Sequence, residues 1–155
     1  MKEYKIKFDN HIENGKYDVL PEHKGIYLFR VSVPTSDNHI DSFIVYIGKA
    51  DGEKGLKGRI NDGHEHIADA KKLIADINSK LLTSDKKCRL TISYSEKADY
   101  SNDDIERIEA ALIFYKKPIL NDKCKFSFTY EKTIVNVSGE HKADLDEKCV
   151  AEKTE

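Results

Sequence analysis

The sequence predicts an α+β fold, with a small, mostly antiparallel three-stranded sheet flanked by helices and a C-terminal β extension. Three observations lead to this prediction. Short apolar runs rich in β-forming residues end at turn residues, and stretches with helical spacing of apolar residues lie between them. The first two apolar runs, residues 25–33 and 43–47, flank a Pro-Thr-Ser-Asp-Asn turn segment, which favours an antiparallel hairpin. The length of 155 residues suits one domain with a substantial core.

The first half of the chain is predicted to consist mainly of strands. Residues 4–8 alternate between apolar and polar side chains, as in a short edge strand, whereas residues 14–24 contain Gly, Asp and Pro and form a loop. Residues 25–33 place successive side chains on opposite faces, and residues 43–47 are almost continuously apolar, so both are predicted strands. Residues 48–58 are rich in Gly and Lys and form no regular element over their full length.

The second half is predicted to alternate helices with strands. Apolar residues recur at helical spacing in its helical stretches, and a serine followed by acidic residues marks one helix start. The expected elements are a helix opening at Arg59, a helix over residues 65–82, a strand over residues 88–94, a helix from Ser101 to Lys117, and one or two strands within residues 126–137.

Charge and composition divide the chain into a body, residues 1–137, and an acidic tail, residues 138–155. The chain has 26 Lys and Arg against 28 Asp and Glu, a net charge of −2. The tail contains three of the basic and six of the acidic residues and few apolar ones, which predicts disorder. The body is therefore nearly neutral, and a phosphate-binding surface needs an uneven distribution of charge. Lys71 and Lys72 begin a lysine-rich stretch that would track a phosphate backbone, or else form a solvated helix face.

The sequence gives no sign of export or membrane insertion. It has no apolar stretch of membrane-spanning length and no signal-peptide pattern near its first residue. Cys88, Cys124 and Cys149 are far apart and show no CxxC or zinc-ligand spacing, so we expect reduced thiols. These features predict a cytoplasmic protein with no membrane partner.

Glu109 is the clearest candidate functional residue. On a helical wheel it falls inside the apolar arc that includes Ile105 and Leu112. A carboxylate on the core-facing side of a helix costs several kcal/mol unless a cation or a metal ion compensates it. The alternative is a structural role, in which Glu109 pairs with Lys49 or Lys116 at the edge of the apolar face.

Two tyrosines belong to short tripeptides, Gly25-Ile26-Tyr27 and Tyr46-Ile47-Gly48, that would lie side by side in the predicted hairpin. A lone tyrosine on a strand usually packs in the core with its hydroxyl at the rim. A tyrosine that serves as a general base needs nearby cations, because its ordinary pKa is about 10. Lys49 and Arg59 are the available cations.

The two tripeptides, Arg59, and a later segment follow one another in the order seen in one known family. The later segment carries Glu109, Leu112, Ile113, Pro118 and Asn121. With these motifs the chain resembles the GIY-YIG nucleases over residues 19–122. It departs from the family pattern in the eighteen residues between the tripeptides and in the stretched Gly-Glu-Lys-Gly region before the arginine.

The resemblance implies a GIY-YIG-like fold and a DNA endonuclease that hydrolyses phosphodiester bonds by direct attack of water, restriction-like or related to repair or phage functions. It implies Tyr46 as general base with Tyr27 assisting, and Arg59 as the residue that stabilises transition-state charge. Lys57 would replace the arginine if the alignment shifts. Glu109 would bind Mg²⁺ or Mn²⁺, and a single hard carboxylate suits an ion that keeps most of its waters.

The resemblance also suggests two further site residues. The family often has His or Tyr about one helical turn after its arginine; His64 lies five positions after Arg59 and His66 seven, and neither spacing matches cleanly. Asn121 would lie near the site and contact nucleic acid, or would be a turn residue. DNA is the expected partner, with specificity supplied by a homodimer or a targeting protein. The alternatives are a nucleic-acid-binding domain without activity and a protein-interaction domain of the same fold.

Overall fold

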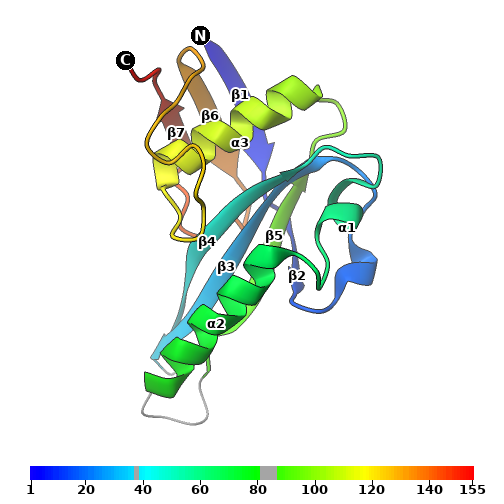
Figure 1. The fold of residues 1–155 in the computed structure, drawn as a ribbon, viewed down its shortest axis with the longest axis vertical. Coiled ribbons are helices and arrows are strands. Elements are labelled where there is room, and N and C mark those ends of the chain that lie inside the picture. The colour runs from blue at the N-terminus through cyan, green and yellow to red at the C-terminus, as the bar shows by residue number, and fades with distance from the viewer. Residues whose placement is uncertain (37–38, 81–86) are drawn as a thin grey trace.

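The computed structural model describes residues 1–36, 39–80 and 87–155, and it has the predicted α+β class (Figure 1). Its strands form two sheets, of four and three strands, in which most neighbouring pairs are antiparallel. The predicted single sheet of three strands is therefore wrong in its count.

The larger sheet contains the predicted hairpin. Strands β3 (Gly25–Ser36) and β4 (His39–Ala50) pair antiparallel, with a register shift between Phe29 and Arg30, and β5 (Arg89–Glu96) pairs with β3 on its other side. A fourth strand, β2 (Asn10–Glu13), extends the sheet beyond β5. The order β2-β5-β3-β4 leaves β4 at an open edge of the sheet.

The smaller sheet joins the two ends of the chain. Strand β1 (Lys2–Lys7) pairs in parallel with β6 (Thr133–Ser138), and β6 pairs antiparallel with β7 (Lys148–Ala151). The prediction of a disordered tail over residues 138–155 is wrong, because this segment contributes β7. Three of its apolar side chains are buried: Leu145, Cys149 and Ala151 are at most 1% exposed. Of the one or two strands predicted within residues 126–137, the structure has one, β6.

Three α-helices and a short 3₁₀ helix, η1 (Tyr17–Val19), complete the fold. Helix α1 (Gly55–Arg59) ends at Arg59, so the predicted helix start at that residue is wrong. Helix α2 (Glu65–Lys80) confirms the predicted second helix, whose last two residues lie outside the described ones. Helix α3 (Asn102–Lys116) begins as predicted, with the Ser101 hydroxyl accepting the Asp104 N–H at 3.1 Å.

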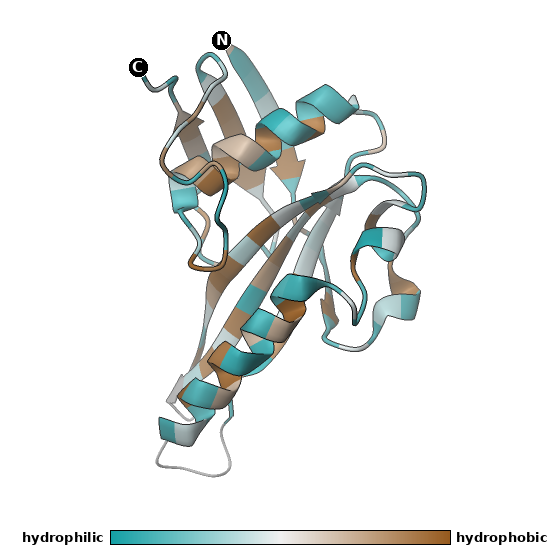
Figure 2. Cartoon of the chain, in the orientation of Figure 1, coloured by the Kyte–Doolittle hydropathy of each residue, from teal (hydrophilic) through white to brown (hydrophobic). Residues whose placement is uncertain are grey.

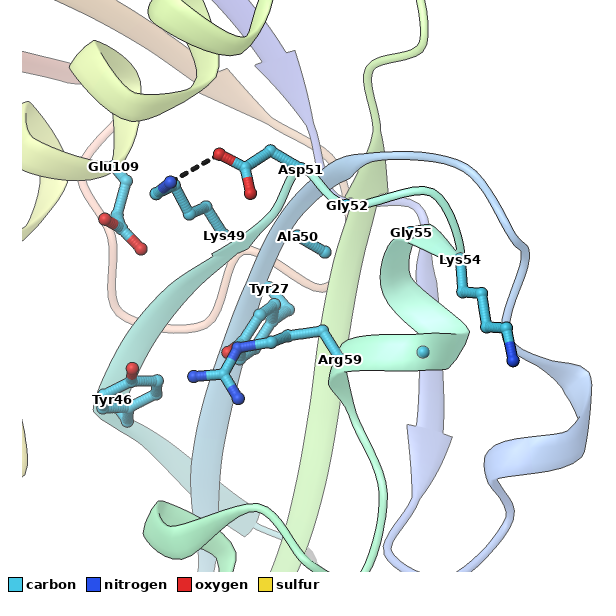
Figure 3. Close-up of a pocket in the computed structure, with 11 residues that line it drawn as sticks. Tyr27, Tyr46, Lys49, Ala50, Asp51, Gly52, Lys54, Gly55, Arg59 and Glu109 are labelled. Atoms are coloured by element: carbon cyan, nitrogen blue, oxygen red, sulfur yellow. Dashed lines mark hydrogen bonds and ion pairs between the residues drawn. The ribbon is translucent and has the colours of Figure 1, made fainter.

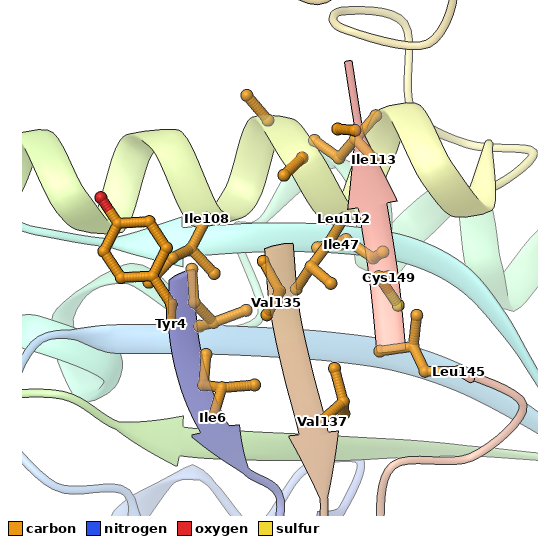
Figure 4. Close-up of a cluster of buried hydrophobic side chains, with 14 of the residues drawn as sticks. Tyr4, Ile6, Ile47, Ile108, Leu112, Ile113, Val135, Val137, Leu145 and Cys149 are labelled. Atoms are coloured by element: carbon orange, nitrogen blue, oxygen red, sulfur yellow. The ribbon is translucent and has the colours of Figure 1, made fainter. Parts of the chain in front are cut away.

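Two buried clusters lie on opposite faces of the larger sheet. One joins that sheet to α3 and the smaller sheet, and Figure 4 shows Ile108 and Leu112 of α3 pointing toward Val135 of β6. The other lies beneath α1 and α2, where Tyr27 and Phe29 of β3 are fully buried. Polar and apolar residues alternate along α2, as in an amphipathic helix (Figure 2). Among the described residues, no helix is long and apolar enough to cross a membrane.

Candidate functional site

A cavity of about 530 Å³ lies where β4, α1 and α3 meet. It is lined by five of the predicted site residues: Tyr27, Tyr46, Lys49, Arg59 and Glu109. Figure 3 shows the side chains of the two tyrosines, the arginine and the glutamate turned toward this space. Residues from four separate parts of the sequence therefore line the same cavity.

The open edge of β4 brings these residues together from the two faces of the sheet. Tyr27 and Tyr46 belong to the cluster beneath α1 and α2, whereas α3 packs on the opposite face. Glu109 extends from α3 to the edge of β4, where its carboxylate accepts a hydrogen bond from the Lys49 backbone N–H. An unpaired backbone donor of an edge strand thus fixes the position of the carboxylate.

Burial raises the pKa of Glu109 to about 7, although Lys49 acts in the opposite direction. The Lys49 ammonium lies 2.5 Å from the Asp51 carboxylate and stands between Asp51 and Glu109 (Figure 3). Burial alone would lower the pKa of Lys49, but the hydrogen bond and charge of Asp51 hold it above its ordinary value. The site therefore contains a half-buried carboxylate that favours a nearby positive charge.

The glycine of the second tripeptide makes room for the tyrosine of the first. Tyr27 lies opposite Gly48 in the register of β3 and β4, and a Cβ at Gly48 would overlap the Tyr27 ring. The rings of Tyr27 and Tyr46 then lie with centroids 6.1 Å apart and planes tilted by 38°. The paired tripeptides thus have a steric reason to occur together.

Arg59 is the cation that acts on both tyrosines. Burial raises the pKa of Tyr27 and of Tyr46 above the ordinary value, and the Arg59 charge lowers both. The charge of Lys49 acts on Glu109, whose pKa it lowers, and its predicted role beside Tyr46 stays a prediction.

His64 is buried, with 3% of its surface exposed, and both of its ring nitrogens form hydrogen bonds. Its Nδ1 accepts the His66 backbone N–H at 3.1 Å, so that the imidazole also caps the start of α2. Burial, Arg59 and His66 together lower the pKa of His64 to about 4, so the ring is neutral at pH 7. With Nδ1 accepting, the proton is on Nε2, which donates to the Tyr27 hydroxyl at 2.8 Å.

One chain of hydrogen bonds runs from the His66 backbone N–H through His64 to the Tyr27 hydroxyl. Because the Tyr27 oxygen accepts from His64, the Tyr27 proton is left for another acceptor. Burial and the Glu109 charge raise the pKa of Tyr46, and Arg59 acts against this rise. The two tyrosines thus differ in their surroundings: Tyr27 is fully buried and bonded to His64, whereas Tyr46 is partly exposed beside His66.

His66 and Asp51 belong to the site although the sequence did not select them. The His66 ring stacks on Tyr46 at 4.2 Å between centroids, and an adjoining hollow is lined by Tyr46, His66 and Glu109. Asp51 lines the main cavity. The Gly-His-Glu-His spacing contained the signal for His66, since alternate residues at a helix start can approach the same strand.

Four other predicted contact residues lie elsewhere or are otherwise engaged. Asn121 is buried, and its amide is occupied by the Ile47 backbone, which donates and accepts at 2.9 Å each. Its predicted contact with nucleic acid stays a prediction, since Asn121 also lines the hollow beside Tyr46 and His66. Lys57 is exposed on α1 and is absent from the lining of the main cavity. Lys71 and Lys72 are exposed on α2, where Lys71 lines a separate hollow with Asn78 and Arg89.

The donor set around Glu109 fits a hard divalent cation that takes few protein ligands. Among residues 1–36, 39–80 and 87–155, no three His, Cys, Asp or Glu side chains are grouped as a preformed metal site. A half-buried carboxylate that faces a cavity suits Mg²⁺ or Mn²⁺, because such ions keep water and take further oxygens from a substrate phosphate. Glu109 is the residue that would hold such an ion.

A scan against protein-family models, a search of curated proteins and a search of solved structures each found no match. The function of the cavity is therefore inferred from the chemistry of its residues.

Proposed function

We propose that the protein is a metal-dependent DNA endonuclease of the GIY-YIG type, which hydrolyses phosphodiester bonds. The observation that carries the proposal is the convergence of Tyr27, Tyr46, Arg59 and Glu109 on one cavity. A purely structural role explains each of these side chains separately, but it does not explain why a carboxylate from α3 meets two tyrosines from the opposite face of the sheet.

In this proposal Tyr46 is the general base. It takes a proton from the attacking water, and the Arg59 charge lowers its pKa against the burial and the Glu109 charge that raise it. The guanidinium of Arg59 also stabilises the negative charge that grows on the phosphoryl oxygens. A divalent ion at Glu109 would supply further positive charge beside the scissile phosphate.

His64 and Lys49 have supporting roles. His64 donates to the Tyr27 hydroxyl and so leaves the Tyr27 proton for another acceptor. Lys49 holds positive charge next to Glu109 and lowers its pKa, against the burial that raises it to about 7. Neither residue needs to exchange a proton with the substrate.

The test is cleavage of supercoiled plasmid by purified protein, with Mg²⁺ or Mn²⁺ and with EDTA. We expect metal-dependent cleavage that is lost in Glu109→Gln and in Tyr46→Phe, while both variants keep the fold. Glu147→Gln is the matched control, because Glu147 is exposed on a different part of the surface and its loss should leave activity unchanged.

Two results would contradict the proposal. Cleavage by Glu109→Gln at the wild-type rate would remove the metal assignment, and undiminished cleavage by Tyr46→Phe would remove Tyr46 as the base. Metal-independent retention of DNA without cleavage would instead favour a binding domain that lacks activity.

A further inference from the structure

The segment between α3 and β6 forms a basic loop, residues 117–130, that borders the site. Lys123, Cys124 and residues 127–130 line a hollow of about 520 Å³ whose other walls include Glu109 and Lys49. Figure 1 shows this loop beside β4. A strand of substrate that reaches Glu109 through this hollow would therefore pass along the loop.

The basic loop is anchored at both of its ends. Near its start, the Leu120 N–H donates to the Val45 carbonyl at 2.9 Å, and Asn121 pairs with the edge of β4. Near its end, Phe128 is buried, its N–H donates to the Thr154 hydroxyl at 3.1 Å, and its carbonyl accepts the Thr154 N–H at 3.0 Å. The residues between these anchors are thereby held in a fixed position next to the site.

Phe126 stands at the outer surface of this loop and is 80% exposed. Lys117 holds the backbone beneath it, because its ammonium donates to the carbonyls of Phe114 and Lys125 at 2.6 Å each. The ammonium groups of Lys117 and Lys125 lie 5.8 and 5.9 Å from the centroid of the Phe126 ring. The exposed Phe126 ring therefore offers a stacking face with two ammonium groups beside it.

The chemistry of this arrangement matches an unpaired nucleotide. A base outside a duplex can stack on an aromatic ring, and the phosphates on either side of it meet lysine ammonium groups. Bases inside a duplex are already stacked and cannot reach such a ring. Lys117, Lys123 and Lys125, against the single acidic residue Asp122, give residues 117–130 a local positive charge.

We propose that the basic loop binds a single-stranded segment of nucleic acid, with one unpaired base stacked on Phe126 and its neighbouring phosphates at Lys123 and Lys125. The inference rests on the proposed function and narrows it. The substrate class would be DNA with a single-stranded arm or an unpaired region. The bound single strand would run through the adjoining hollow, which brings the scissile phosphate to Glu109.

The experiment is binding of fluorescently labelled oligonucleotides, measured by anisotropy in EDTA so that no cleavage occurs. The probes are an oligothymidine, a fully paired duplex and a forked duplex with one single-stranded arm. We expect Phe126→Ala to weaken binding of the oligothymidine and the fork by roughly 5- to 100-fold, the usual effect of losing one stacking contact, and to leave the duplex almost unaffected. Phe126→Trp should restore the affinity, and Ile119→Ala, at an exposed apolar residue of the same loop, should not change it.

The outcomes separate this inference from the proposed function. Phe126-dependent binding of single strands by a protein that cuts no DNA would support the inference and contradict the nuclease. Plasmid cleavage with single-strand binding that Phe126→Ala does not change would overturn the inference alone. Retention on anionic lipid vesicles that needs Phe126, without binding of oligonucleotides, would also overturn it.

Discussion

Some residues in and beside the cavity also serve the fold. His64 is the clearest case, because one ring nitrogen caps α2 and the other donates to Tyr27. A protonated ring cannot accept the His66 N–H, so the cap and the hydrogen-bond direction both require neutral His64. Glu109 has a similar double role, since its carboxylate satisfies the Lys49 N–H and faces the cavity.

This dual role predicts that His64 makes stability depend on pH. Its pKa is about 4 in the folded state and 6.5 in the unfolded one, so the unfolded chain takes up the proton first. Stability is therefore present above pH 6.5 and is lost as the pH falls toward 4, by up to roughly 3 kcal/mol. Urea unfolding of wild type and of His64→Asn at several pH values isolates this contribution, because asparagine caps a helix without titrating.

The comparison of wild type with His64→Asn removes the influence of other titrating groups. One of these is Glu109, whose raised pKa increases stability as the pH falls over part of the same range. We expect the difference in unfolding free energy to change steadily between pH 6.5 and 4. Parallel pH profiles for the two proteins would show that His64 does not have the assigned protonation state.

At the scale of elements, the open edge of β4 organises the site. Three groups that are distant in sequence meet its backbone: the Leu120 N–H binds the Val45 carbonyl, the Asn121 amide binds both backbone groups of Ile47, and Glu109 binds the Lys49 N–H. An edge strand is thus completed by side chains and by one loop rather than by another strand. The same contacts hold Tyr46, which lies between Val45 and Ile47.

We predict that Asn121→Ala destabilises the protein by about 2–4 kcal/mol, because it leaves the buried N–H and carbonyl of Ile47 without partners. Urea unfolding measures the loss, with Asp122→Ala at the exposed neighbouring residue as control. If Asn121 were instead a contact for nucleic acid, its replacement would weaken DNA binding and leave stability unchanged.

The elements that were predicted from sequence are those whose pattern is local. The hairpin, α2 and the start of α3 follow from apolar spacing and from the Ser101 cap, and their residues carry these signals within a few positions. Strand β2 has one buried residue, Ile12, and β7 is short, so neither shows a pattern without its partner strand. The site was also predicted only as far as local motifs allow. The motif residues were identified, but the role of Asn121 depends on the backbone of Ile47, which is far away in sequence.

For the molecule as a whole, the two ends of the chain support the helix that carries Glu109. Helix α3 packs on the smaller sheet, whose strands come from the first residues and from the segment after 132. The acidic segment also contributes polar anchors, since the Lys116 ammonium lies 2.8 Å from the Asp144 carboxylate. The position of Glu109 therefore depends on a segment whose composition predicted disorder.

Leu145→Ala tests this dependence. Leu145 is 1% exposed and packs in the cluster that joins α3 to the smaller sheet (Figure 4), so its truncation should cost about 2–5 kcal/mol in unfolding free energy. Lys153→Ala, at an exposed residue of the same segment, should cost almost nothing. In a disordered tail both substitutions would be neutral, because neither side chain would lose a packed environment. Urea unfolding of the two variants decides between an ordered and a disordered segment, and a loss confined to Leu145→Ala would establish that the C-terminal residues support α3.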